Sequence, residues 1–255
     1  MEPEACNQCG AMDCLQTATF QSAKAARIDS LKASLRELGR EGKSWRERFV
    51  VQELLLNLGQ RFEDADVISV GPKDEPPDVL FGAARFEVKE IFDKGRQRET
   101  EFKSALQEAE QATTCAELMP LEDYTPIDIS LADVLREAER TGLKHSQRYD
   151  RVLVPTLDLL LYHNLIDAIG LTDEAMPSTT TLAAQRWRSV SVVFGHRAIV
   201  LSATRDAPAY LQSAIGWVAH RPIRPRSAFA STAVFGVAIL ALIVAAVAVA
   251  IAVAA

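Results

Sequence analysis

The chain has 255 residues, of which 48% are hydrophobic and 24% are charged, so most of it is expected to fold around one sizeable core. The formal net charge is −6 and the sequence pI is near 5.4, which excludes a uniformly basic protein that coats nucleic acid nonspecifically. The sequence contains no G-x-x-x-x-G-K-[ST] and no G-x-S-x-G segment, so it gives no support to a P-loop nucleotide site or an α/β-hydrolase.

Residues 1–20 are interpreted as a flexible leader. They carry no basic segment followed by a long apolar run, so no secretory signal is predicted and the protein is expected in the cytoplasm. Cys6, Cys9 and Cys14 form a C-x2-C-x4-C pattern, but Cys115 is distant and no second pair follows at zinc-finger spacing. These cysteines either belong to a zinc or redox site or are simply reduced thiols.

Two helices are predicted between residues 20 and 59, with a break between two glycines, Gly39 and Gly42. Ser44 is expected to cap the second helix, with Glu47 three residues later completing a capping box. Glu53 lies in the middle of the apolar part of this helix. A carboxylate there either meets a cation or faces the solvent, because burying it alone is costly.

A β-hairpin is predicted in the stretch PDVLFGAARFEVK at residues 77–89, after a first strand at residues 66–70. Side chains alternate between the two faces of a strand, so Glu87 and Lys89 share one face. A turn near Gly82 would bring the carboxylate of Asp78 close to Glu87. Two carboxylates beside an ammonium group favour a Mg²⁺ site, because this ion prefers hard oxygen ligands and keeps several waters.

This pattern, PD followed after eight residues by ExK, resembles the PD-(D/E)xK superfamily of restriction-endonuclease-like nucleases. It also looks like a family of uncharacterised bacterial proteins described as endonucleases. The resemblance covers about residues 44–115. It implies that Asp78 and Glu87 hold Mg²⁺ or Mn²⁺, with the Val88 carbonyl assisting, and that Lys89 positions a water. The superfamily places a further glutamate on the preceding helix, a role expected for Glu53, with Glu47 as the alternative.

A basic segment opens the next predicted helix, which runs from about residue 96 to residue 113. Its cations are Lys94, Arg96, Arg98 and Lys103. They either contact a nucleic-acid backbone beside the metal or form a solvated face paired with Glu99 and Glu101.

The remaining elements complete an α/β (α+β) domain over residues 21–220, with a mixed central sheet flanked by helices. The next strand is expected either at residues 151–154 or at 158–162, after a helix at 130–145. A second hairpin is expected at residues 190–202, followed by a short helix from Pro208. The four histidines show no metal-ligand spacing and are interpreted as surface or turn residues: His145, His163, His196 and His220.

The C-terminal segment differs from the rest, because residues 233–255 contain no charged residue. A helix of this length could cross a hydrocarbon core, and the basic linker at 221–232 favours a cytoplasmic side. The segment is either a tail anchor in the inner membrane or a low-complexity extension.

Together these patterns predict a Mg²⁺-dependent endonuclease that hydrolyses DNA phosphodiester bonds. Many nucleases of the resembled class cut as dimers, which adds a homodimer to the implied partners. Two alternatives stay open: a binding module with this fold but no turnover, and a membrane-tethered regulatory protein. The sequence does not decide between DNA and RNA.

Overall fold

The computed structural model describes residues 8–39, 42–74, 76–92, 95–119, 127–165, 168–172 and 175–221. The helices in this part of the chain are α1 (Gln8–Leu38), α2 (Lys43–Asn57), α3 (Arg98–Gln111), α4 (Cys115–Leu118), α5 (Leu131–Ser146), α6 (Thr180–Ala184) and α7 (Ala209–Gln212). The strands are β1 (Val67–Ser69), β2 (Val79–Phe81), β3 (Ala84–Ile91), β4 (Ile127–Ile129), β5 (Asp158–His163), β6 (Ala168–Leu171), β7 (Ser189–Phe194), β8 (Arg197–Ala203) and β9 (Val218–His220).

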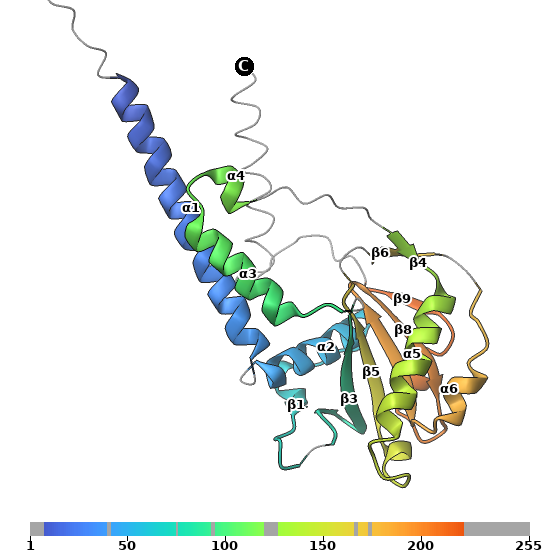
Figure 1. The fold of residues 1–255 in the computed structure, drawn as a ribbon. Coiled ribbons are helices and arrows are strands. Elements are labelled where there is room, and N and C mark those ends of the chain that lie inside the picture. Colours follow the sequence, from blue (N-terminus) through green and yellow to red (C-terminus); the bar gives the residue numbers. More distant parts are fainter. Residues whose placement is uncertain are drawn as a thin grey trace, which may run out of the picture. The chain divides into compact units, whose positions relative to one another are not determined.

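Seven of these strands form one mixed sheet in the order β1-β2-β3-β5-β7-β8-β9 (Figure 1). β1, β2 and β3 make an antiparallel meander, β3, β5 and β7 are parallel, and β8 and β9 return antiparallel. The central strand β5 contributes Leu159, Leu160 and Leu161, all fully buried. A run of consecutive apolar residues suits a parallel strand that is covered on both faces.

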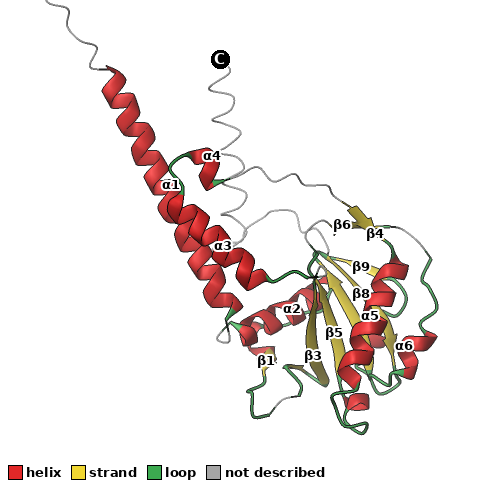
Figure 2. Ribbon diagram, viewed as in Figure 1, coloured by secondary structure: helices red, strands yellow, loops and turns green. Residues whose placement is uncertain are grey.

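Helices cover both faces of the sheet (Figure 2). On one face α5 and α6 pack through residues such as Leu135 and Leu182 against β5, β7 and β8. On the other face α2 packs through Val51, Leu54 and neighbouring residues, and α7 through Leu211. The mixed sheet flanked by helices is therefore as predicted from the sequence.

A smaller apolar cluster joins α1 to α3 and α4. Leu31 of α1 is buried against Ala109 and Leu118, and Phe102 packs at the edge of the cluster. α1 begins at Gln8, inside the stretch 1–20 for which a leader was expected, so its helix is longer than the sequence pattern predicted.

Other predictions need correction. α2 begins at Lys43, its N-cap is Gly42 without a side-chain cap, and the predicted capping box of Ser44 and Glu47 is wrong. The strand after α5 is β5, whereas Val154–Thr156 forms a short 3-10 helix because Pro155 cannot donate a strand hydrogen bond. The two-stranded parallel sheet of β4 and β6 was not predicted.

No helix among the described residues is long and apolar enough to cross a membrane. The segment 233–255 lies outside the described residues, as does most of the basic linker that precedes it. The tail anchor therefore stays a prediction.

Candidate active site

A tight hairpin sets the position of Asp78. β2 and β3 are joined at Gly82, whose φ of +52° suits a residue without a side chain. Directly before β2, the main-chain N–H of Asp78 donates to Phe86 O at 2.9 Å. The Asp78 carboxylate then accepts a hydrogen bond from the main-chain N–H of Val88, also at 2.9 Å. The backbone of β3 therefore fixes the direction in which this buried carboxylate points.

Lys89 joins the two carboxylates of the hairpin. Its Nζ lies 3.2 Å from Asp78 Oδ2 and 2.5 Å from Glu87 Oε1, and it donates to Val88 O at 2.9 Å. Asp78 is 3% exposed and Glu87 is 2% exposed, whereas the Lys89 side chain keeps 20% of its surface. The structure thus brings together the three side chains that the hairpin pattern singled out, and oxygens from three residues converge on one cation.

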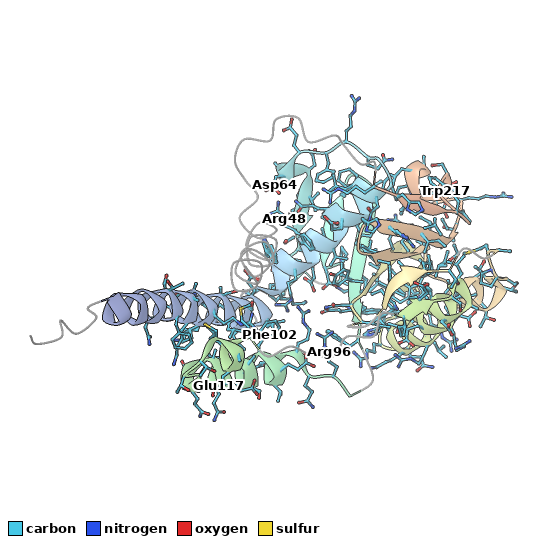
Figure 3. All side chains as sticks on the ribbon, turned by 90° about the horizontal axis from the view of Figure 1, so that it is seen from above. Arg48, Asp64, Arg96, Phe102, Glu117 and Trp217 are labelled. Atoms are coloured by element: carbon cyan, nitrogen blue, oxygen red, sulfur yellow. The ribbon has the colours of Figure 1, made fainter. Side chains whose placement is uncertain are left out.

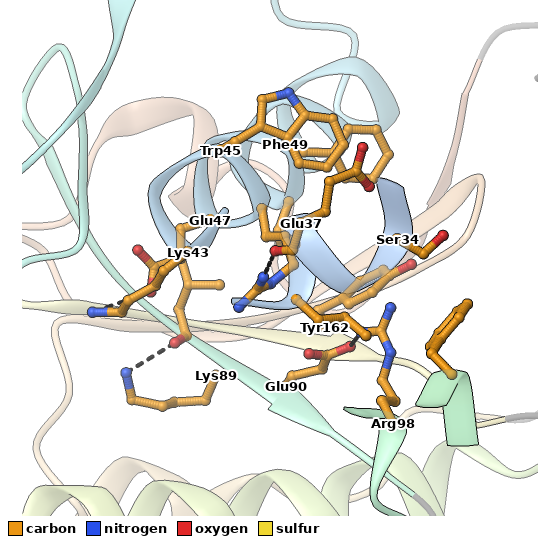
Figure 4. A pocket seen from close by; sticks show the side chains of 15 residues that line it. Ser34, Glu37, Lys43, Trp45, Glu47, Phe49, Lys89, Glu90, Arg98 and Tyr162 are labelled. Atoms are coloured by element: carbon orange, nitrogen blue, oxygen red, sulfur yellow. Dashed lines mark hydrogen bonds and ion pairs between the residues drawn. The ribbon is translucent and has the colours of Figure 1, made fainter. Parts of the chain in front are cut away.

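Helix α2 adds a second lysine and a third carboxylate to this group (Figure 4). Lys43 Nζ lies 3.2 Å from Asp78 Oδ1 and 3.5 Å from Glu47 Oε1. Burial raises the pKa of Glu47 to about 7, and the negative charge of Asp78 raises it too. The positive charges of Lys43 and Lys89 partly oppose this rise. Glu47 therefore exchanges a proton near neutral pH.

Helix α5 and the turn after it cover the group from the opposite face of the sheet. The hydroxyl of Tyr149, which follows the end of α5 at Ser146, donates to Glu87 Oε1, and His145 lies in the last turn of the helix. Burial lowers the pKa of His145 to about 4, and Lys89 is the largest of the cationic neighbours that add to this effect. The Nδ1 atom of His145 is buried and has no hydrogen-bond partner among the described residues. His145 is half-buried in the last turn of α5, whereas the prediction of a surface or turn histidine is wrong for His163, which is 8% exposed on β5.

Helical spacing does not relate the two residues on this side of the site. His145 lies in the last turn of α5, but Tyr149 follows the end of the helix at Ser146. Nothing in the local sequence says that Tyr149 meets the β2–β3 hairpin, because its contact with Glu87 spans 62 residues.

Among the described residues, no group of three or more histidine, cysteine, aspartate or glutamate side chains has the geometry of a metal site. Mg²⁺ does not require such a group, because it is often bound by one or two carboxylates and keeps its remaining waters. The donors that fit are the Asp78 and Glu87 carboxylates and the Val88 carbonyl, whose oxygens already surround one cationic nitrogen. A bound ion would take the place of the Lys89 ammonium group between them.

The family of the chain is shown by a match over residues 24–223 to the family described as "Putative endonuclease, protein of unknown function (DUF1780)". The chain belongs to this family. No curated protein matches it. A solved structure of a protein of unknown function from Pseudomonas aeruginosa strain PAO1, described as a member of the monooxygenase superfamily, is 25% identical. The match covers 80% of this chain and 94% of that one, with a TM-score of 0.54.

The structure places Glu53 away from the Asp78 and Glu87 carboxylates of the β2–β3 hairpin. Its side chain lies 3.3 Å from Arg221, and burial raises its pKa against the effect of that arginine. The glutamate of α2 that shares Lys43 with Asp78 is Glu47, so the alternative residue lies nearer to the predicted site than Glu53 does.

Three of the four predicted nucleic-acid contacts have a carboxylate partner among the described residues. Arg96 lies 3.0 Å from Glu101, Arg98 lies 2.6 Å from Glu90, and Lys103 lies 2.7 Å from Glu99. Lys94 lies outside the described residues. Because such partners can exchange for phosphate, these contacts remain predictions.

A second buried aspartate lies at the start of β5. Asp158 is fully buried and accepts hydrogen bonds from the Arg85 main chain at 2.9 Å, from Ser189 Oγ at 2.8 Å and from two nitrogens of Arg188. Arg188 is also fixed by Ala83 O at 3.0 Å. Every oxygen of this carboxylate is satisfied by the fold itself.

Proposed function

We propose that the chain is a metal-dependent endonuclease that hydrolyses phosphodiester bonds of DNA. The observation that carries this proposal is the convergence of Asp78, Glu87 and the Val88 carbonyl on the ammonium group of Lys89, a position that a metal cation could take over. Oxygen donors of this kind suit Mg²⁺ or Mn²⁺, and a lysine next to them is suited to orient a water.

The order of the elements supports the proposal. A helix (α2), an antiparallel meander (β1 to β3), a helical connection and a parallel strand (β5) follow one another as in the restriction-endonuclease-like core. The family description as an endonuclease points in the same direction. The monooxygenase description belongs to the Pseudomonas aeruginosa protein.

The residues of the site have separate roles in this proposal. Asp78, Glu87 and the Val88 carbonyl would hold the ion, which supplies charge stabilisation at the scissile phosphate. Once displaced from the carboxylates, Lys89 donates a hydrogen bond that orients the attacking water. Glu47 accepts a proton near neutral pH, as its raised pKa allows.

The end of α5 and the turn after it would act on the site through Tyr149 and His145. The Tyr149 hydroxyl holds the carboxylate of Glu87 in one orientation, and neutral His145 keeps an uncharged nitrogen beside Lys89. Tyr149 is a positioning residue, because it acts on the site through Glu87, whereas His145 acts only as an uncharged group near Lys89.

Cleavage of plasmid DNA by the purified full-length protein tests the proposal. We expect nicking with Mg²⁺ or Mn²⁺, no nicking with EDTA, and loss of cleavage in Asp78→Asn and Glu87→Gln. Asp29→Asn is the control, because Asp29 is exposed on α1. Salt-dependent binding without cleavage of any DNA or RNA would favour the binding module instead.

A further inference from the structure

A cavity of about 450 Å³ opens directly beside the carboxylate–lysine group. Its walls come from α1, α2, β3, α3 and β5, and three residues of the candidate site, Lys43, Glu47 and Lys89, also line it (Figure 4). Its volume lies within the range of roughly 300–1,000 Å³ that small-molecule sites occupy. One ligand could therefore occupy this cavity and reach the carboxylate–lysine group at the same time.

Aromatic rings form a large part of the cavity wall. Trp45 and Phe49 stack on each other at 5.6 Å between ring centroids with an interplanar angle of 15°. They are 51% and 39% exposed, which is unusual for large apolar side chains on one helix. Phe102 and Tyr162 contribute further rings from α3 and β5. Such rings offer flat surfaces on which another planar group can stack.

The cavity also contains hydrogen-bonding groups. Glu90 Oε1 accepts from Arg98 Nη1 and from Asn164 Nδ2, both at 2.6 Å. These two donors fix the carboxylate, while Glu90 Oε2 accepts no hydrogen bond from the part of the chain that the structure describes. A fixed acceptor at the side of a stacking surface suits the amino group of a planar heterocycle.

We propose that this cavity receives one unpaired nucleobase of a strand whose phosphate lies at the carboxylate–lysine group. The inference rests on the proposed function and names its substrate class: nucleic acid with unpaired nucleotides, such as single strands, flaps and loops. Aromatic side chains hold such bases by stacking. A base in an intact duplex must first be unstacked and unpaired, which disfavours it.

Binding can be measured without cleavage, so the two proposals can be separated. Fluorescence anisotropy with Ca²⁺ would compare a fluorescein-labelled single-stranded 12-mer with its duplex. We expect tighter binding of the single strand. Trp45→Ala should weaken that binding by about 5- to 150-fold, the range that corresponds to loss of one stacked base, and Trp45→Phe should restore most of it.

Trp217 provides a matched control, because it is 52% exposed and lies away from Phe102 (Figure 3). Trp217→Ala should bind like the wild type. As an independent readout, an oligonucleotide with 5-bromouracil should photocrosslink to Trp45, Phe102 or Tyr162, located by mass spectrometry of the adduct.

Equal binding of single strand and duplex, or a Trp45→Ala variant that binds and crosslinks like the wild type, would overturn the nucleobase site. If the wild-type protein still cleaved plasmid with Mg²⁺ after such a result, the endonuclease proposal would stand without the nucleobase site. Crosslinking at the cavity together with an absence of cleavage would instead support the nucleobase site and remove the nuclease.

Discussion

Two buried aspartates of the same sheet differ in the cations that hold them. Asp158 is held by Arg188, whose planar guanidinium donates two hydrogen bonds and keeps only 11% of its surface. Asp78 is held by Lys43 and Lys89, whose side chains keep 43% and 20% of theirs. A lysine that reaches solvent can leave a carboxylate more easily than a partly buried arginine that is fixed by several hydrogen bonds. Burial of a carboxylate therefore does not indicate function unless its cation can be exchanged.

The largest effect that would break this comparison is on stability. Asp158→Asn leaves the partly buried Arg188 without a charged partner, and we expect a loss of about 3–5 kcal/mol in the free energy of unfolding. Asp78→Asn should lose much less, because its two lysines can turn to solvent. Denaturant unfolding of both variants, with Asp29→Asn as the surface control, measures the difference. A larger loss for Asp78→Asn would mean that the roles of the two aspartates are reversed.

Replacing the exchangeable cation sharpens the comparison further. Lys89→Met removes the positive charge that competes with a metal ion for Asp78 and Glu87, so Mn²⁺ should bind as tightly as before or more tightly. Cleavage should nevertheless fall by about 10²-fold or more, as for loss of an orienting or proton-transfer group. Calorimetry and plasmid nicking measure the two effects. Weaker Mn²⁺ binding in Lys89→Met would contradict the displacement of this lysine by metal.

A smaller effect concerns protons at Glu47. Its pKa of about 7 is above the ordinary 4.5, so the folded protein binds more protons than the unfolded chain between these values. Its contribution to stability is therefore complete below pH 4.5 and is lost as the pH rises through about 7. As the pH rises over this interval, we expect the free energy of unfolding to fall less for Glu47→Gln than for the wild type.

Metal binding gives a second measurement of the same group. At pH 7, Mn²⁺ should release protons from wild-type protein, seen by calorimetry in buffers of different ionisation enthalpy. Glu47→Gln should release fewer protons. Glu53→Gln is the control and should behave like the wild type, because Glu53 pairs with Arg221 outside the site. The assignment of Glu47 fails if Glu53→Gln alone abolishes the release.

The smallest expected effect is at the surface. The Lys103–Glu99 pair is exposed, so Lys103→Ala should change stability by less than about 0.5 kcal/mol. If Lys103 contacts a phosphate, the slope of log affinity against log salt should decrease by about 0.7–0.9. An unchanged slope would leave Lys103 as a solvated residue paired with Glu99.

The local part of the site could be predicted from the sequence because it depends on strand alternation and one turn. Asp78, Glu87 and Lys89 lie within a single hairpin, and a period of two fixes the face that each one takes. The helices and most strands of the domain follow from similar local patterns. In contrast, the neighbours of β3 and the placement of α5 depend on contacts between distant segments.

Glu47 was ranked second to Glu53 for a different reason. It lies on the same helical stripe as Val50, Val51 and Leu54, which are buried, whereas Glu53 lies off that stripe. The periodicity of α2 therefore favours Glu47, but the apparent capping box at Ser44 led to the interpretation that Glu47 caps the helix. The helix begins one residue before Ser44, so that role does not exist.

The parallel pairing of β3 with β5 has a consequence for synthesis of the chain. Residues 43–91 provide the lysines and carboxylates, but β3 gains its inner neighbour only when residues 158–163 are present. Tyr149, which holds Glu87, also comes after the long helical connection. Contacts between such distant segments form slowly, because the intervening chain must first be closed into a loop. A ribosome-bound chain thus carries the charged groups early but assembles the complete site only when the domain is almost finished.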